Sequence, residues 1–190
     1  IISAVDRSKA EGQRNRAILE TLYSCGLRVS ELVNLKLSDL YFDEGFIKVE
    51  GKGSKQRLVP ISPRAINEIK LYFTDRNRIE VKKEYEDFVF VSQRRGKGLS
   101  RIMIFHMIKE LAQTAGIIKN ISPHTFRHSF ATHLLEGGAN LRAIQCMLGH
   151  ESIATTEIYT HIDRNMLRSE IIEHHPRNIK YRKEKEELFH

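Results

Sequence analysis

The sequence is poor in cysteine and contains no long apolar run. Only two cysteines occur among its 190 residues, and Cys25 and Cys146 lie far apart, without a C-x-x-C pair or the spacing of a zinc knuckle. We therefore expect no disulfide framework, and two thiols buried in helices of a protein from a reducing compartment. No apolar run approaches the roughly 18–20 residues that a membrane helix needs, and the start of the chain does not resemble a signal peptide.

Two common nucleotide- and metal-binding motifs are also missing. The loop 51–55 lacks the G-x-x-x-x-G-K-[ST] pattern of a P-loop and precedes an expected strand instead of a helix. His124 and His128 have the i, i+4 spacing of metal-binding helices, but there is no adjacent glutamate as in H-E-x-x-H and no acidic third ligand nearby. These absences argue against a nucleotide-binding P-loop and against a metal site.

What the sequence has in excess is positive charge. The formal net charge is +7 and the isoelectric point is near 9.5. The hydrophobic fraction of 41% and the charged fraction of 29% are ordinary for a globular chain, which is long enough for one substantial domain with a real core. The basic balance predicts a polyanionic partner.

Apolar periodicity predicts a mainly helical domain. Residues 18–23 repeat at helical spacing before Gly26, which is expected to end that helix, and further helices are expected from Ser30, from Pro63 and from Ser100 onward. Between them, turn-rich segments separate short β-like runs: Leu40–Phe42, Phe46–Glu50 and Gln56–Ile61, with Phe88–Val91 as one more possible strand. The predicted fold class is α+β, a mainly α-helical domain with a small three-stranded antiparallel sheet at one edge. Residues 180–187 are densely charged and predict a solvated helix or a frayed tail.

A histidine and an arginine occupy the start of one expected helix. Ser122 is a good N-cap and Pro123 fits the first helical position, so His124 lies in the first turn. Arg127 follows three residues later, and the two side chains can reach a common spot. Beside the free N–H groups of a helix start, this pair predicts a phosphate site, although each residue alone is more often a capping or surface residue.

Two further polar residues lie near the next helix. Asn140 is expected to cap that helix and Gly149 to end it, which leaves His150 in a turn where it can point into a cleft. Tyr159 is expected on another short helical stretch. A lone tyrosine in such a place most often packs or lies at an interface.

Five short segments in a fixed order carry the most specific signal. They are GLRVSEL at 26–32, GKGSKQRLVP at 51–60, HTFRH at 124–128, LGH at 148–150 and YTH at 159–161. Together they resemble the tyrosine recombinases, also called the phage integrase family, and most closely the Xer-type branch. The resemblance implies the fold of the DNA breaking-rejoining enzymes and a site-specific recombinase or integrase.

The resemblance also implies the chemistry. Tyr159 would attack the scissile phosphate, leaving a 3′-phosphotyrosyl bond and a free 5′-hydroxyl. Because a phenol has a pKa near 10, its anion needs nearby positive charge or a base. Arg28 and Arg127 can each donate two hydrogen bonds to phosphate oxygens, and His150 would add a third donor.

Proton transfer is assigned to three other residues by the same resemblance. His124 fits a general base or proton shuttle, and Lys52 resembles the general acid for the leaving 5′-oxygen, with Lys55 as its rival. Glu31 is expected to brace Arg28 or to cap its helix. A phosphotyrosyl ester keeps the energy of the phosphodiester, so neither ATP, another cofactor nor a metal is implied.

Other basic residues are candidates for contacts along double-stranded DNA, with solvated surface as the equal alternative for any one of them. These candidates are Lys55, Arg57, Arg94, Arg95, Lys97, Arg101 and Arg142. The resemblance implies four protomers on two DNA sites, as a homo-tetramer or with a paralogue, and a bacterial, nucleoid-associated protein of the cytoplasm. The segment Ile171–His175 and the residues after it are candidates for docking onto a neighbouring protomer.

The expected organisation is a catalytic domain at residues 1–176 and a charged tail at 177–190. The N-terminal helical domain that family members use to clamp the other face of DNA is absent from these 190 residues. Two alternatives remain: a type IB topoisomerase that relaxes supercoils as a monomer, and a catalytically inactive module that binds DNA through residues 140–161 like a helix-turn-helix. The complete catalytic set argues against the second.

Overall fold

The computed structural model describes residues 1–149 and 161–188, which form α-helices around a small sheet. The helices are α1 (Gly12–Cys25), α2 (Val29–Val33), α3 (Pro63–Arg76), α4 (Arg101–Thr114), α5 (Pro123–Glu136), α6 (Leu141–Leu148), α7 (His161–His174) and α8 (Pro176–Glu187). The strands are β1 (Leu40–Tyr41), β2 (Phe46–Glu50) and β3 (Gln56–Pro60). The predicted α+β class is confirmed.

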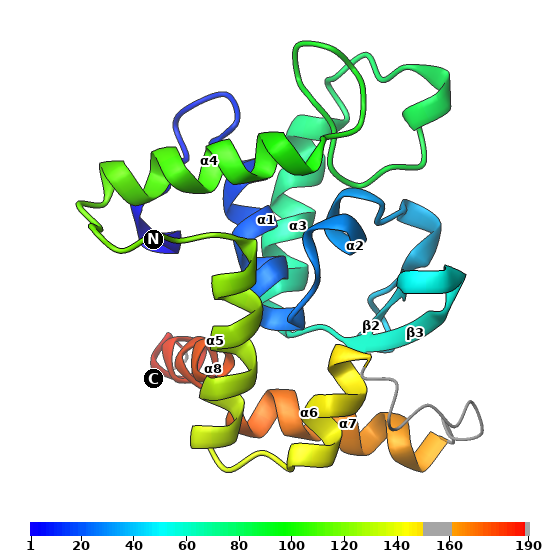
Figure 1. The fold of residues 1–190 in the computed structure, drawn as a ribbon, viewed down its shortest axis with the longest axis vertical. Coiled ribbons are helices and arrows are strands. Elements are labelled where there is room, and N and C mark those ends of the chain that lie inside the picture. Colours follow the sequence, from blue (N-terminus) through cyan, green and yellow to red (C-terminus); the bar gives the residue numbers. More distant parts are fainter. Residues whose placement is uncertain (150–160, 189–190) are drawn as a thin grey trace.

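Helices α1 and α3 pack side by side at the centre of the molecule, with α4 across one end (Figure 1). Ile18 and Leu22 of α1 are fully buried, as are Ile69 and Tyr72 of α3 to within 1%. Burying each such side chain contributes about 1.5–3 kcal/mol. The apolar spacing of α1 and its end at Gly26 agree with the sequence prediction.

The sheet has the order β1-β2-β3 with antiparallel neighbours. Ile47 pairs with Val59, and both side chains are fully buried against the helices. The strand bounds agree with the predicted runs within one residue. The β2–β3 hairpin lies at the edge of the molecule, on the side away from the N-terminus (Figure 1).

The possible strand at Phe88–Val91 is wrong, since this run makes only isolated bridges, one between Lys36 and Phe88 and one between Val91 and Gly98. Residues 89–91 are buried, and the backbone groups of the run bond partly to backbone, as where the Val89 N–H donates to the Leu35 carbonyl at 3.0 Å, and partly to side chains. Arg76 donates to the carbonyls of residues 88 and 89 at 2.7–3.2 Å, and the Tyr72 hydroxyl accepts from the Val91 N–H at 3.2 Å. These bonds give the run backbone partners without a fourth strand.

A second apolar cluster lies where α5, α6 and α7 meet, beyond the sheet (Figure 1). Phe130 and Leu134 of α5 are fully buried there, and Phe126 of the same helix is buried in the central core, 7% exposed. The predicted inward stripe of α5 is therefore confirmed. Ile144 and Met147 of α6 complete the cluster, so the end of α6 is fixed against α5.

Residues 177–187, predicted as a charged tail, belong to helix α8. Its first turn is anchored because Arg177 and Arg64 both pair with the fully buried carboxylate of Glu20, whereas its last turns are exposed. Among the two cysteines, Cys25 is buried as predicted and Cys146 only half-buried. None of the described helices is long and apolar enough to cross a membrane.

Candidate active site

The loop between α1 and α2 presents Arg28. Gly26 adopts a φ of +64°, and a Cβ there would lie 2.4 Å from the Phe130 ring, so the chain can turn here only because the residue is glycine. Arg28 then starts α2 as its N-cap residue. Its side chain is 40% exposed, which leaves much of the guanidinium group open to solvent.

Glu31 holds Arg28 in place. One oxygen accepts from the Arg28 backbone N–H at 2.9 Å, and the other accepts from its Nη1 at 3.1 Å. The predicted bracing and capping roles of Glu31 are thus both confirmed. Burial acts to raise the pKa of Glu31, but bonds and charge from Arg57 and Arg28 outweigh it and the pKa is lowered. The carboxylate therefore stays ionised between the arginines.

Arg57 is the second partner of this carboxylate. Its Nη1 and Nη2 donate to the two Glu31 oxygens at 2.6 and 3.0 Å, and its Nε donates to the carbonyl of Met147 at 2.9 Å. The side chain is only 9% exposed. Arg57 was predicted as a DNA contact, whereas three of its donors are engaged by partners inside the protein.

Arg127 lies on the other side of the cluster, on α5. Its two terminal nitrogens donate to the carbonyls of Gly26 and Leu148, each at 2.7 Å. Burial first, and then repulsion from Arg28, lower its pKa to about 10. Because Arg127 bonds the carbonyl of Gly26, two residues before Arg28, the structure brings the two predicted phosphate-binding arginines near one another.

The hairpin between β2 and β3 carries Lys52 and Lys55, and both are exposed. The turn includes Gly53 at φ +72° and Ser54 at φ +58°, and the Gly51 N–H closes it by donating to the Lys55 carbonyl at 2.8 Å. A Cβ on Gly51 would lie 3.5 Å from the Glu31 carboxylate. The base of the hairpin therefore contacts the arginine cluster, while the turn itself projects outward.

His124 lies in the first turn of α5, exposed, three residues before Arg127. Ser122 begins the helix as predicted, and its N–H donates to the Thr125 hydroxyl at 3.0 Å. The pair of His124 and Arg127 thus sits on one helix start, next to the end of α1 that Arg127 contacts.

The end of α6 forms the remaining described wall. Asn140 caps the helix by accepting from the Ala143 N–H at 3.2 Å, and Gly149 ends it at φ +71°, both as predicted. Arg57 and Arg127 bind the carbonyls of residues 147 and 148. His150 and Tyr159, the predicted third donor and nucleophile, lie outside the described residues.

This arrangement of charges suits an anion. Arg28 and Arg57 pair with one carboxylate, Glu31, and Arg127 bonds two backbone carbonyls beside them, so three positive charges accompany one negative charge. Partly buried guanidinium groups hold phosphate oxygens with defined geometry. Within the described ranges, no group of three His, Cys, Asp or Glu side chains is placed to hold a metal ion.

The remaining predicted DNA contacts lie on the surface. Several of them fall in two segments, the hairpin turn and the loop at 93–98. The exposed candidates are Lys55, Arg94, Arg95, Lys97, Arg101 and Arg142. Their exposure leaves them available to a polyanion, in contrast to Arg57.

Sequence reasoning missed what Arg57 does. The signal was present, because Arg57 and Val59 are two residues apart on β3 and must share a face of the sheet. Val59 is fully buried, so the register of the strand directs Arg57 toward the interior. Its carbonyl partner at Met147, ninety positions away in the chain, left no signal in the sequence.

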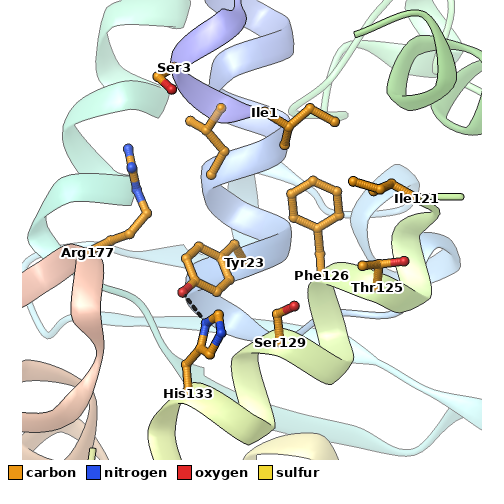
Figure 2. A pocket seen from close by; sticks show the side chains of 10 residues that line it. Ile1, Ser3, Tyr23, Ile121, Thr125, Phe126, Ser129, His133 and Arg177 are labelled. Carbon is orange, nitrogen blue, oxygen red and sulfur yellow. Dashed lines mark hydrogen bonds between the residues drawn. The ribbon is translucent and has the colours of Figure 1, made fainter. Parts of the chain in front are cut away.

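A separate cavity of about 300 Å³ lies between α1, α5 and the start of the chain (Figure 2). Ile1, Ile121 and Phe126 form its apolar part, and Tyr23 bonds His133 Nδ1 at 2.6 Å on its wall. None of the predicted catalytic residues that the structure describes lines this cavity.

Comparison with known proteins gives a consistent picture. Residues 1–166 match the phage integrase family. The chain is 51% identical over 164 residues to tyrosine recombinase XerD of Chlorobaculum tepidum, covering 86% of this chain and 54% of that protein. It is 46% identical over 177 residues to tyrosine recombinase XerD of Pseudomonas putida, covering 93% and 59%.

Solved structures show the same fold. The XerA recombinase superposes with a TM-score of 0.71 at 37% identity, covering 92% of this chain and 61% of that one. The XerH site-specific recombinase bound to difH substrate, a pre-cleavage complex, gives 0.67 at 27% identity, covering 87% and 45%. The chain thus spans about half to three fifths of the length of these relatives.

Proposed function

Because this chain belongs to the phage integrase family, we propose that it is the catalytic part, residues 1–176, of a site-specific DNA recombinase that cuts and rejoins strands through a 3′-phosphotyrosyl bond at Tyr159. One observation carries the proposal. Arg28 and Arg127 meet beside Glu31, between the base of the lysine hairpin and the end of α6. This arrangement supports a role of the two arginines in holding one phosphate group of DNA.

The chemistry follows from the residues around that phosphate. The two arginines neutralise charge on its non-bridging oxygens as the pentavalent transition state forms, and a preorganised donor of this kind typically contributes about 3–4 kcal/mol. The phenolate of Tyr159 attacks phosphorus and the bond to the 5′-oxygen breaks. His124, as general base or proton shuttle, takes the proton that the Tyr159 hydroxyl loses. Lys52 protonates the leaving oxygen, which yields a free 5′-hydroxyl. His150 donates a further bond to the phosphate.

The partner of this chemistry is double-stranded DNA. The net charge of +7 and the exposed basic residues of the hairpin and of the loop 93–98 support it. One structural relative was solved bound to its difH substrate, and we propose the same class of ligand here. Since the named sequence relatives are bacterial proteins, we place this activity on the DNA of a bacterial cytoplasm.

For assembly, we propose four protomers on two DNA sites, with the C-terminal segment docking onto a neighbour. In the single chain, Ile171 and His175 are buried against α5 and α1, so exchange requires this segment to leave its own core. Deleting residues 173–190 should abolish cooperative assembly on paired sites. Deleting only residues 182–190, of which 182–188 are described and exposed, is the milder control. Unchanged assembly in the longer deletion would contradict the proposal.

The function is tested by trapping the covalent intermediate. The chain is mixed with nicked duplexes drawn from a random-sequence pool, in which the nick lets the cleaved fragment diffuse away and prevents rejoining. We expect a protein–DNA adduct that survives SDS, and its loss in Tyr159→Phe. An adduct that persists in Tyr159→Phe would refute the assignment of the nucleophile. Efficient relaxation of plasmid supercoils without sequence preference would indicate a topoisomerase instead.

A further inference from the structure

Arg57 carries a charge that the proposed reaction does not use directly. Its side chain is 9% exposed, and three of its donors are engaged by Glu31 and by the Met147 carbonyl at 2.6–3.0 Å. Three of its five N–H donors are thus engaged inside the protein, and the buried side chain offers little surface to a phosphate of DNA. Its position is therefore that of a structural link within the site, and not of a DNA contact.

Three elements meet at this one guanidinium group. The side chain starts on β3, in the hairpin that carries Lys52, and its paired nitrogens bind Glu31 of α2, the same carboxylate that orients Arg28. Its Nε binds the last turn of α6, two residues before Gly149. Gly149 lies so close that a Cβ there would be 3.1 Å from Arg57. The segment that leads to His150 is thus packed directly on this arginine.

A guanidinium group is needed for this link. Its fixed fork bonds both carboxylate oxygens while the Nε points in a third direction. A lysine at the same position has one flexible ammonium group, which can neutralise Glu31 but cannot hold the two oxygens and the Met147 carbonyl in the same geometry. Arg57→Lys therefore keeps the positive charge but loses the geometry of the three hydrogen bonds.

We propose that Arg57 is a positioning residue for strand cleavage, which fixes Arg28 through Glu31 and fixes the end of α6 relative to the lysine hairpin. This inference rests on the proposed function. It predicts that loss of the guanidinium fork slows the chemical step and leaves DNA affinity unchanged. Misplacement of reacting groups by about 1 Å typically costs about 100-fold in rate.

The test compares Arg57→Lys with the unmodified chain on a nicked duplex that the unmodified chain selects from the pool. We expect cleavage of bound DNA, at saturating protein, to slow by about 100-fold, with the dissociation constant for the duplex unchanged. If the unmodified chain forms no adduct, the proposed function fails. If both proteins cleave at the same rate, only the positioning role fails.

The matched control is Arg76→Lys. Arg76 is 8% exposed and also binds backbone carbonyls, those of residues 86, 88 and 89, but it lies away from the arginine cluster. The Arg76→Lys variant should lose about as much thermal stability as Arg57→Lys. Its folded protein should still cleave at the rate of the unmodified chain. Equal slowing in Arg76→Lys would mean general loosening of the fold and would overturn the proposal.

Arg57→Ala supplies a second variant with two independent readouts. Methylguanidinium added at constant ionic strength should restore part of its cleavage by occupying the vacated site on Glu31. The slope of log affinity against log salt should equal that of the unmodified chain, since no phosphate contact is lost. A slope reduced by about 0.9, the value for one phosphate contact, would show that Arg57 binds DNA directly and would overturn the proposal.

Discussion

Arg28 and Arg127 hold their guanidinium groups in different ways, and substitutions should separate the two. Arg28 is 40% exposed and bonds to Glu31, whereas Arg127 bonds to two backbone carbonyls. Either change to lysine should slow cleavage by about 100- to 1000-fold. Arg28→Lys should lower the free energy of unfolding by at most about 1 kcal/mol, and Arg127→Lys by about 2 kcal/mol.

Urea unfolding and single-turnover cleavage measure the two effects independently. Equal stability losses in both variants would contradict the structural difference between the residues. Unchanged cleavage in either variant would remove that arginine from the phosphate site.

His175 makes stability depend on pH. It is fully buried, its Nε2 bonds the Tyr23 carbonyl at 3.1 Å, and burial lowers its pKa from 6.5 to about 4. Well above pH 6.5 the residue is neutral in both the folded and the unfolded chain, so it does not lower the free energy of unfolding. As the pH falls toward 4, only the unfolded chain takes up the proton, and the free energy of unfolding should drop by up to about 3 kcal/mol.

The variant His175→Gln isolates this effect, because glutamine keeps a donor for the Tyr23 carbonyl without titrating. Unfolding free energies are compared for both proteins between about pH 7 and about pH 4. The unmodified chain should lose more stability than the variant over that interval. Parallel curves would show that His175 protonates freely in the folded state.

Local pattern predicted some residue roles and not others. Glu31 follows Arg28 at helical i, i+3 spacing, so its bracing role was visible in the sequence. The pairing of Arg127 with the end of α6 and of Arg57 with Met147 depends on how α5, β3 and α6 pack, and no local pattern encodes it. Charge alone therefore did not reveal the internal partners of Arg57.

At the scale of elements, the turn after α1 requires glycine for two separate reasons. Gly26 needs a φ of +64° and has the Phe130 ring where its Cβ would lie, at 2.4 Å. Gly116, after α4, has a similar φ of +68° but open space around it. Gly116→Ala should cost about 1–2 kcal/mol for the left-handed backbone alone, and Gly26→Ala about 3–4 kcal/mol, because overpacking adds to that strain.

Thermal and urea unfolding of the two variants measure the difference. An equal loss of unfolding free energy in Gly26→Ala and Gly116→Ala would contradict the close contact between Gly26 and the Phe130 ring. Since Gly26 precedes Arg28 by two residues, Gly26→Ala should also slow cleavage by the surviving folded protein, and Gly116→Ala should not.

Helices and strands were largely predictable because their signals are local. The caps at Ser122 and Asn140 and the glycines after α1 and α6 define helix ends by backbone chemistry. The run Phe88–Val91 has strand composition, but it makes only isolated bridges, and Arg76 and Tyr72 bond several of its backbone groups. That outcome depends on partners distant in the sequence, which composition does not reveal.

For the whole molecule, positive charge should set how DNA binding depends on salt. Arg94, Arg95 and Lys97 are exposed together in one loop. Changing all three to alanine should reduce the slope of log affinity against log salt by about 0.9 for each phosphate contact that is lost. The measurement is a titration of a labelled duplex at several salt concentrations.

The control removes the same charge elsewhere. Lys180, Arg182 and Lys183 are exposed on α8, away from the arginine cluster, and their replacement by alanine should leave the slope unchanged. Equal reductions in both triple variants would mean that net charge alone, and not the loop at 93–98, determines binding.

The central claim is that Tyr159 becomes covalently joined to DNA at a phosphate held by Arg28 and Arg127. The most direct measurement digests the SDS-stable adduct with nuclease and protease and locates the remaining nucleotide by tandem mass spectrometry. We predict a nucleotide joined through its 3′-phosphate to Tyr159, with the adduct strongly reduced in Arg28→Lys and Arg127→Lys. A nucleotide on any other residue, or joined through a 5′-phosphate, would contradict the account.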